Sequence, residues 1–502
     1  MTESLVSEPA VSAEPFVAEL RPAPDPGDAF ERLSDLPFVL FLDCPEGAGG
    51  RARYAYLTAS PFFAVLAREG ATEIRAPATD DLREERFVAV ERTHGDPLAA
   101  LARSAAAWRI EPVSGLPPFQ GGAAGAFGYG LGRSIERLPP PARDEFRAPD
   151  LAAGLYDWVL AFDRERGSCH IVAHGFPERT PGARRARAER RAREVRRLLE
   201  ARRPPTSRLR AETAAPLGES DLGPAWPVPG PGGLRSDFSR EAYVEAVERA
   251  IEKICAGEIF QVNLSQRLLL PQREPAVQTY RRLRRANPAP FGGFFALPGH
   301  ILASASPEEF LRLQDGAVST RPVKGTRPRG RAAEEDAALR AELAQSSKDQ
   351  AENVMIVDLL RNDLSRVARL HTVRVERLFE VETHPTVHHL VSEVRARLRD
   401  GLGFADLLRA TFPGGSVTGA PKIRAMEIIA ELERHARGFY CGSLGWIGFD
   451  GALHLNVSIR TLTVARGWIQ IPVGGAVTAP SDPPAEYQET LDKAAGMLAA
   501  LR

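Results

Sequence analysis

In the C-terminal half of the chain, the spacing of apolar residues alternates between helical and strand-like patterns. After Ser239, a suitable helix cap, apolar side chains recur at Tyr243, Val247, Ile251 and Ile254, the spacing of one buried helix face. The next segment, EIFQVNLSQRLLL, alternates between apolar and polar residues and predicts a strand. Further helices are predicted over 331–345, 347–364, 403–411, 421–435 and 484–500, and strand groups over 290–324, 371–396, 440–462 and 468–478.

The N-terminal half has the pattern of short strands separated by glycine and proline. Runs such as PFVLFLDC and YAYLTASPFFAVLA are apolar, and YDWVLAFDRERGSCHIVAH predicts a hairpin that turns at 164–167. A run of arginine, alanine and glutamate over 184–203 predicts a helix. Because no aromatic residues interleave with its charges, a solvated helix face is favoured over nucleic-acid binding.

Changes in composition divide the chain into predicted segments. Residues 1–28 are rich in Ala, Pro and Glu and predict a disordered acidic tail, and residues 204–235 predict a Pro/Gly-rich linker. An N-terminal β-rich domain over 29–203 and a catalytic domain over 236–502 remain. Because strand groups and helices follow one another without a regular βαβ repeat, the predicted fold class is α+β with large antiparallel sheets.

Charge and cysteine content exclude several classes of protein. The chain has 502 residues, with 65 basic and 65 acidic side chains, so no net charge favours nucleic acid or an anionic membrane. No apolar run approaches the roughly 18 residues of a spanning helix, and the N-terminus lacks the pattern of a secretory signal. The four cysteines form no CxxC pair, which fits a reducing cytoplasm and disfavours a zinc site. We therefore expect a cytoplasmic enzyme or scaffold.

Lysine is scarce in this chain. The basic residues include only five lysines, which are Lys253, Lys324, Lys348, Lys422 and Lys493. Since arginine supplies positive charge elsewhere, a retained lysine can mark a place where an amine must lose its proton, which arginine does not do. Lys324 lies between a strand-like run and a Gly-Thr turn, amid Arg321, Arg327 and Arg329. The neighbouring positive charge is expected to lower its pKa and free the amine for attack, although a plain surface cation is the alternative.

Two pairs of carboxylates are spaced to share one helix face each. Asp349 and Glu352 form the first pair, and Glu486 and Glu489 form the second, both at i,i+3. Facing each other, two such helices would provide an oxygen-only cage that suits Mg²⁺. Taken singly, each pair also fits an ordinary solvated helix face.

A glycine-rich loop and a pair of histidines are further candidates for a site. FPGGSVTGAPKIRAMEIIAELE offers free backbone N–H groups at a helix start, where an anion such as a carboxylate could bind. Lysine and Ser/Thr are missing from the positions that a Walker A loop requires, and a plain turn into the helix remains the alternative. His388 and His389 lie on an alternating strand, so one faces inward and one outward.

Eight segments together resemble the chorismate-utilising enzymes. In chain order these segments are GEIFQVNLSQR, RPVKGTRPRG, VDLLRNDLSRV, VHHLVSEV, PGGSVTGAPKIRAME, SLGWIGFDG, NVSIRT and EYQETLDKA. The resemblance is dense from about 237 to 502, looser over 37–180, and strongest to component I of the aminodeoxychorismate synthases. It implies an α+β fold with large paired antiparallel sheets surrounded by helices, around a Mg²⁺-dependent chorismate site.

The resemblance also implies roles for matching positions. Glu352 and Glu489 would bind Mg²⁺, with Asp349 and Glu486 supporting them. Lys324, Glu308 and His389 would be catalytic, with Glu308 as the acid that protonates the leaving hydroxyl. The positions implied to bind substrate are Gln261, Thr326, Ser416, Tyr440, Arg460, Gly474, Gly475 and Lys493.

Two of these positions distinguish family members. Gln261 stands where isochorismate and salicylate synthases carry a water-activating lysine, so a nitrogen nucleophile is implied. Lys324 stands where anthranilate synthases usually carry a small residue, which implies amination of chorismate at C4 for p-aminobenzoate and folate synthesis. Anthranilate synthase component I and a non-catalytic chorismate-binding subunit are the alternatives. Because no cysteine lies in a glutaminase motif, ammonia is expected from a separate glutamine amidotransferase subunit.

Overall fold

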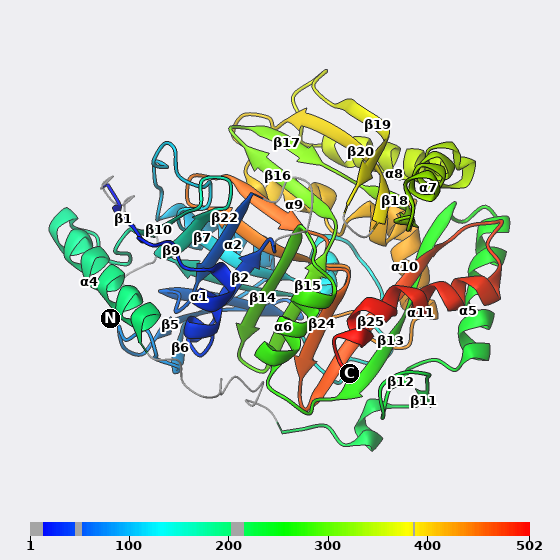
Figure 1. Ribbon diagram of the computed structural model, residues 1–502, viewed down its shortest axis with the longest axis horizontal. Helices are drawn as coiled ribbons and strands as arrows, with labels where there is room; N and C mark the ends of the chain where they lie inside the picture. Colours follow the sequence, from blue (N-terminus) through cyan, green and yellow to red (C-terminus); the bar gives the residue numbers. More distant parts are fainter. Residues whose placement is uncertain (1–13, 46–52, 202–214, 385–386) are drawn as a thin grey trace.

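Two large antiparallel sheets carry the fold, and helices cover them (Figure 1). The computed structural model describes residues 14–45, 53–201, 215–384 and 387–502. Within those ranges the first sheet has 13 strands, in the order β1-β10-β9-β3-β2-β14-β15-β24-β25-β13-β12-β11, and β21 pairs with β13. Its strands are β1 (Phe16–Glu19), β2 (Leu40–Asp43), β3 (Tyr54–Thr58), β9 (Trp158–Asp163), β10 (Ser168–Ala173), β11 (Trp226–Pro227), β12 (Arg235–Ser236), β13 (Gln261–Pro271), β14 (Phe291–Leu297), β15 (His300–Ser306), β21 (Gly419–Ala420), β24 (Thr461–Ala465) and β25 (Trp468–Val477).

The second sheet has 12 strands in the same described ranges. Their order is β18-β20-β17-β16-β23-β22-β7-β8-β4-β5-β6, and β19 pairs with β20. These strands are β4 (Phe63–Arg68), β5 (Ala71–Pro77), β6 (Phe87–His94), β7 (Gly122–Phe127), β8 (Leu151–Tyr156), β16 (Glu309–Gln314), β17 (Ala317–Thr320), β18 (Val323–Pro328), β19 (Arg374–Thr383), β20 (Val387–Arg397), β22 (Ser443–Gly448) and β23 (Leu453–Asn456).

The helices follow the predicted amphipathic spacing in the C-terminal half. They are α1 (Pro26–Leu33), α2 (Pro97–Ala106), α3 (Gly132–Ile135), α4 (Pro181–Glu200), α5 (Arg240–Cys255), α6 (Ala276–Ala286), α7 (Ala333–Gln345), α8 (Ser347–Ser365), α9 (Phe404–Thr411), α10 (Lys422–Leu432) and α11 (Pro483–Ala499), with 3₁₀ turns η1 (Tyr129–Leu131), η2 (Glu219–Leu222) and η3 (Gly415–Val417). Ser239 caps α5 as expected, its side chain accepting from the amide of Ala242. The α+β class is confirmed. Among the described residues, no helix is long and apolar enough to cross a membrane.

Both sheets combine strands from the two predicted domains. In the first sheet β2 pairs with β14, and in the second β7 pairs with β22. An aromatic cluster joins the same two parts of the chain, since Phe30 of α1 and Phe41 of β2 pack on Tyr280 of α6 and Phe294 of β14. The predicted boundary at 204–235 does not coincide with a boundary between the two sheets, and the division into two domains stays a prediction. Of that segment, residues 215–235 are described, and β12 within it pairs with β13.

The N-terminal tail differs from its prediction where the structure describes it. Residues 1–13 lie outside the described ranges, but Phe16–Glu19 form β1 and pair with β10. Helix α1 then starts at Pro26, capped by Asp25, and buries Phe30 and Leu33. The acidic composition of this segment suggested disorder, but its few apolar residues, such as Phe30 and Leu33, pack into the core.

Candidate active site

Lys324 lies on β18 with its amine turned towards the turn η3. Its Nζ donates to the backbone oxygen of Ser416 at 3.2 Å. Burial lowers the pKa of this amine, while the carboxylates of Glu352 and Glu308 oppose that change. The chain thus holds a lysine with weakened proton affinity beside two acids.

The three nearby arginines do not lower the pKa of Lys324 as predicted. Arg321 pairs with Glu382, Arg327 bonds to Glu342 at 2.7 Å, and Arg329 bonds to Asp336 at 2.7 Å. Each guanidinium is therefore balanced by a carboxylate. The pKa of Lys324 is lowered mainly by burial and not, as predicted, by repulsion from the three arginines.

Glu308 is buried next to the same turn. Its side chain is 5% exposed, and burial raises its pKa to about 7, against the opposing effects of Ser416 and Lys324. A carboxyl group with this pKa carries a proton near neutral pH and can donate it. The structure therefore places a potential acid and a potential nucleophile next to Ser416 and close to each other.

Helices α8 and α11 bring the predicted carboxylates together. Glu352 feels the charge of Glu489, and burial raises the pKa values of Glu352 and Glu486. Gly475 of β25 lies against the second pair. A Cβ at that position would be 3.0 Å from Glu486 Oε2 and 3.4 Å from Glu489 Oε1, so a side chain there would crowd both acids. Asp349 accepts from Arg327 at 3.3 Å.

The donors are all carboxylate oxygens, which suit Mg²⁺, although Lys493 is paired with one of them, Glu489. Within the described ranges, no group of three or more His, Cys, Asp or Glu side chains is already arranged around a metal position. Lys493 Nζ lies 2.5 Å from Glu489 Oε1. Glu486 Oε1 accepts from Ser481 at 2.7 Å, whereas its Oε2 is buried without a hydrogen-bond partner. An orphaned carboxylate oxygen beside a second carboxylate is what an oxygen-liganded cation would satisfy.

The two histidines occupy different environments, as the alternation predicts. His388 is fully buried and bonded at 3.0 Å to both Asp336 and Thr383, which is a structural arrangement. His389 is half-buried, with its Nδ1 3.0 Å from the hydroxyl of Thr326. Burial lowers the pKa of His389 to about 4, so its ring is neutral at pH 7.

The residues expected to hold carboxylates surround this cluster. Arg460 is half-buried; its guanidinium bonds to the backbone oxygen of Lys493, and burial lowers its pKa. Lys493 also donates to Gly474 O at 2.9 Å. Tyr440 is buried, and burial raises the pKa of its hydroxyl well above its ordinary value, so it stays neutral and can donate a hydrogen bond.

Gln261 starts β13 beside the glycine-rich loop. Its side chain is fully buried, and neither its Oε1 nor its Nε2 has a hydrogen-bond partner in the structure as described. An unsatisfied buried amide is costly unless a ligand or water completes it. The position is therefore suited to a small polar ligand.

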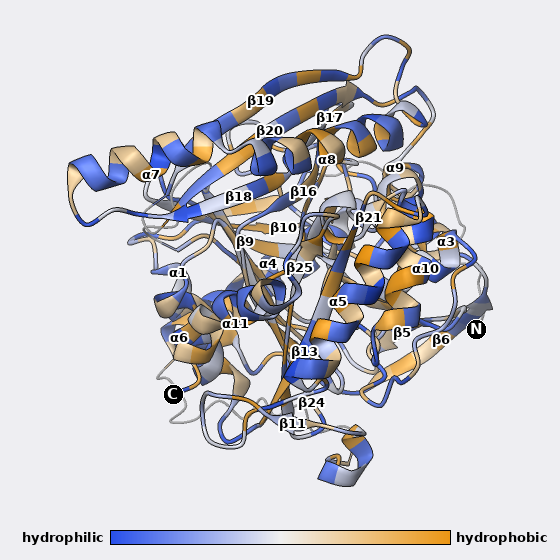
Figure 2. Cartoon of the chain, turned by 90° about the vertical axis from the view of Figure 1, so that its right-hand side faces the viewer, coloured by the Kyte–Doolittle hydropathy of each residue, from blue (hydrophilic) through white to orange (hydrophobic). Residues whose placement is uncertain are grey.

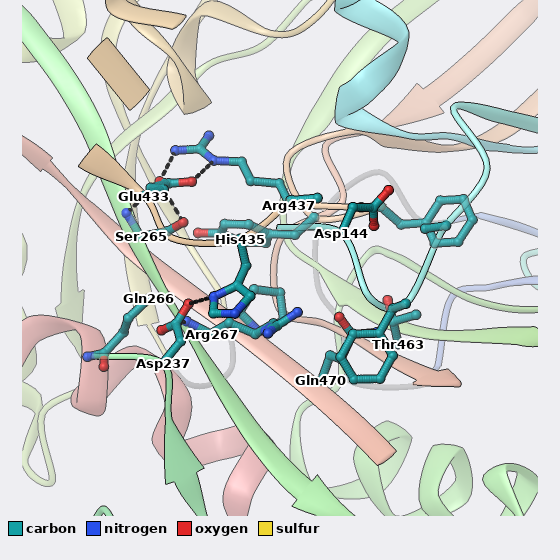
Figure 3. Close-up of a pocket in the computed structure, with 17 residues that line it drawn as sticks. Asp144, Asp237, Ser265, Gln266, Arg267, Glu433, His435, Arg437, Thr463 and Gln470 are labelled. Atoms are coloured by element: carbon teal, nitrogen blue, oxygen red, sulfur yellow. Dashed lines mark hydrogen bonds and ion pairs between the residues drawn. The ribbon is translucent and has the colours of Figure 1, made fainter. Parts of the chain in front are cut away.

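The sequence analysis missed a buried ion pair between Arg437 and Glu433 (Figure 3). Arg437 Nε donates to Glu433 at 2.9 Å, and Glu433 accepts from the Ser265 amide at 2.9 Å. Arg437 also donates to Val417 O at 2.9 Å and Asn263 O at 2.6 Å. One guanidinium thus fixes η3 to β13.

Arg437 matters because η3 carries Ser416. Its guanidinium also lies over the ring of Tyr440, with 5.9 Å to the centroid. The only sequence signal was an acid and an arginine at i,i+4 in ERHARG, which does not differ from a surface pair.

The scarcity of lysine was a better indicator of the site than the i,i+4 pair, since three of the five lysines lie near its carboxylates. Lys324, Lys348 and Lys493 all act electrostatically on the carboxylates of the site. Lys348 was given no role from sequence. Lys422 instead pairs with Asp363 at 2.6 Å, and Lys253 pairs with a surface glutamate on α10.

Comparison with known proteins gives one consistent result. Residues 52–499 match the family model of the chorismate binding enzymes. Aminodeoxychorismate synthase component 1 of Klebsiella aerogenes is 40% identical over 465 residues, 92% of this chain and 94% of that protein. Anthranilate synthase component 1 of Thermus thermophilus is 43% identical over 406 residues, 81% of this chain and 82% of that protein. The crystal structure of anthranilate synthase component I from Streptococcus pneumoniae superposes with a TM-score of 0.72 at 29% identity, covering 90% of this chain and 93% of that chain.

Proposed function

The chain belongs to the chorismate binding enzymes, and from this premise we propose that it aminates chorismate at C4. The product is 4-amino-4-deoxychorismate, the precursor for p-aminobenzoate and folate. The observation that carries the proposal is Lys324, a half-buried lysine whose amine bonds to Ser416 O at 3.2 Å, whose pKa is lowered by burial, and which lies close enough to Glu308 and Glu352 to feel their charges.

Lys324 and Glu308 divide the chemistry of the first step. The neutral amine of Lys324 attacks C2, both conjugated ring double bonds shift, and the bond from C4 to its hydroxyl breaks. Glu308 gives its proton to the departing oxygen, so that water leaves. Ammonia then attacks C4, the ring double bonds return to their original positions, and the bond from C2 to Lys324 breaks. The ammonium group formed at C4 gives one proton to the carboxylate of Glu308, which restores the acid. Chorismate and ammonia are thereby converted to the aminated product and water, with the enolpyruvyl group retained.

Glu352 and Glu489 are proposed as the ligands of Mg²⁺, with Asp349 and Glu486 supporting them. When bound, the ion supplies a Lewis acid that orients the ring carboxylate and favours departure of the hydroxyl. The protein's part is to supply oxygen donors from α8 and α11, and Gly475 leaves out the side chain that would crowd Glu486 and Glu489. Lys493, which bonds to Gly474 O beside these acids, would be available to pair with a substrate carboxylate.

The remaining residues hold and orient the substrate. Arg460 offers a planar fork to a carboxylate. Ser416, Tyr440 and the backbone of Gly474 and Gly475 complete that wall. His389 is neutral and held by Thr326, which suits it to hydrogen bonding rather than to charge. The free amide oxygen of Gln261 is suited to accept a hydrogen bond from the ammonia nucleophile.

Ammonia is proposed to come from a separate glutamine amidotransferase subunit in the cytoplasm. Three of the four cysteines are buried, and burial raises the pKa of each thiol, Cys44, Cys169 and Cys441, to about 12. Such thiols do not form the thiolate that attacks glutamine. Cys255 is exposed at the end of α5, away from any strand-to-helix turn.

Anthranilate synthesis is the second candidate, because one anthranilate synthase is 43% identical to this chain. The two functions differ in the atom that is aminated and in the fate of pyruvate. The test is chromatography of the products formed from chorismate, ammonium and Mg²⁺, with a pyruvate assay. We expect an aminated product that keeps its enolpyruvyl group; anthranilate with stoichiometric pyruvate would establish the alternative.

A further inference from the structure

The two helices that carry the proposed Mg²⁺ ligands pack on different sheets. Helix α8 lies on β20 of the second sheet, and α11 lies on β25 of the first (Figure 2). Glu352 belongs to α8 and Glu489 to α11, yet the charge of one acts on the other. Because an α-helix turns by about 100° per residue, a roll of either helix on its sheet would separate the two carboxylates. Their approach therefore depends on how each helix is fixed.

On α8, the residue after Glu352 is a buried asparagine. The other side chains that the helix buries over the next two turns are apolar, namely Ile356, Val357 and Leu360. Asn353 is fully buried, and its Oδ1 accepts from the hydroxyl of Ser392 on β20 at 2.5 Å. Its Nδ2 has no hydrogen-bond partner in the described part of the chain. Since an unpaired buried N–H is unfavourable, an apolar side chain would fill this position at lower cost.

On α11, the residue after Glu489 repeats this arrangement. Thr490 is fully buried, on a helix face that also buries Tyr487, Ala494 and Met497. Its Oγ1 accepts from Nε2 of Gln266 on β13 at 2.5 Å. Gln266 is buried as well, and its Oε1 accepts from the hydroxyl of Ser236 at 2.6 Å. Both ends of the Gln266 amide are therefore held.

Each helix thus has a buried polar bond to a strand at the position that follows its glutamate. Apolar packing is non-directional and by itself allows a helix to roll, whereas a hydrogen bond fixes a direction. Fixing the register of packed elements is the best-attested use of buried polar groups. With Asn353 and Thr490 held against their strands, the directions in which Glu352 and Glu489 leave their helices are set.

We propose that Asn353 and Thr490 are positioning residues for the Mg²⁺ site, which fix the rotation of α8 and α11 through Ser392 and Gln266. This inference rests on the proposed function, because Glu352 and Glu489 are metal ligands only within it. Neither positioning residue needs to touch the ion. Loss of a residue that orients a metal ligand typically lowers metal affinity by about 10- to 100-fold.

Matched variants separate positioning from packing. Thr490→Val keeps the shape of the side chain without its hydroxyl, whereas Thr490→Ser keeps the hydroxyl. On α8, Asn353→Leu combined with Ser392→Ala removes both partners of the bond. Val357→Ala is the packing control, since it removes only apolar contact from the same helix. Titration calorimetry of the full-length, metal-free proteins measures Mg²⁺ affinity, and the thermal midpoint is measured without metal.

We expect Thr490→Val and the α8 double variant to bind Mg²⁺ at least tenfold more weakly than the wild type. Thr490→Ser should stay within about twofold. Val357→Ala should also stay within about twofold, although its thermal midpoint falls. The Thr490 variants decide the test if the α8 variant does not fold.

Wild-type Mg²⁺ affinity in Thr490→Val would overturn the proposal. So would an equal loss of affinity in Val357→Ala, because loosened packing would then explain the effect. Failure of the wild type itself to bind Mg²⁺, with or without chorismate, would instead contradict the metal site of the proposed function.

Discussion

Replacing Glu308 by glutamine should raise the stability of the protein above neutral pH while it removes the acid of the reaction. Glu308 is 5% exposed, and its pKa is raised from 4.5 to about 7 by burial. At 1.36 kcal/mol for each pH unit, this difference corresponds to about 3 kcal/mol. Because the folded-state pKa lies above the unfolded one, the protonated carboxyl contributes its full stability below pH 4.5. That contribution is lost as the pH rises to about 7, whereas glutamine stays neutral throughout.

Urea unfolding at pH 5.5 and pH 8.0 measures this effect. The free energy of unfolding of Glu308→Gln, relative to wild type, should rise by about 2 kcal/mol between these pH values, since only the part of the titration above pH 5.5 is sampled. Chorismate turnover by the same variant should fall at least a hundredfold.

Glu309→Gln is the matched control, at the next position along the chain. Burial alone would raise the pKa of Glu309, but His454 and Arg321 outweigh it and lower the pKa. Its carboxylate is therefore ionised in both folded and unfolded chains at pH 5.5 and 8.0, so proton uptake by this carboxyl adds no pH dependence to the cost of its loss. If the stability difference for Glu308→Gln were equally independent of pH, Glu308 would be an ordinary carboxylate and the assignment of the acid would fail.

Further variants test three other parts of the site. Glu352→Gln and Glu489→Gln should each lower Mg²⁺ affinity at least tenfold by titration calorimetry without changing the thermal midpoint; full wild-type activity in excess chelator would contradict a role for the metal. Lys324→Arg keeps the charge but loses the nucleophile, so turnover should fall at least a thousandfold; retained amination at C4 would show that Lys324 only supplies charge. Arg437→Gln leaves Glu433 buried and unpaired, at a cost of about 3–5 kcal/mol in unfolding free energy, and adding Glu433→Gln should restore part of it. A cost near zero would mean that the pair does not hold η3.

The C-terminal helices and strands could be predicted because their buried faces repeat regularly. Helix α8 begins at 347 as the pattern predicts and ends one residue later, and α11 begins one residue earlier. The order in the N-terminal tail could not be predicted. Its strand has four residues and its helix two turns, so each contains too few apolar positions to show a repeat. The mixing of strands across the linker was also hidden, because pairing between β2 and β14 spans about 250 residues of chain and has no local signal.

The candidate site was predictable where residue type and spacing carry chemistry. The two carboxylate pairs and the isolated Lys324 belong to this class, and the structure brings them together. The cause of the lowered pKa of Lys324 was assigned wrongly, because sequence shows the three arginines but not the acids that neutralise them. Arg437 was missed for a related reason, since its value comes from carbonyl oxygens far away in the chain.

The role of Lys324 as nucleophile is tested most directly by trapping its adduct. The wild-type chain is incubated with chorismate and Mg²⁺ without ammonium or glutamine, and intact mass and peptide mapping follow. We predict a covalent species heavier by chorismate less one water, located on Lys324 and converted to free product when ammonium is added. Absence of the adduct, together with release of anthranilate and pyruvate once ammonium is present, would contradict amination at C4.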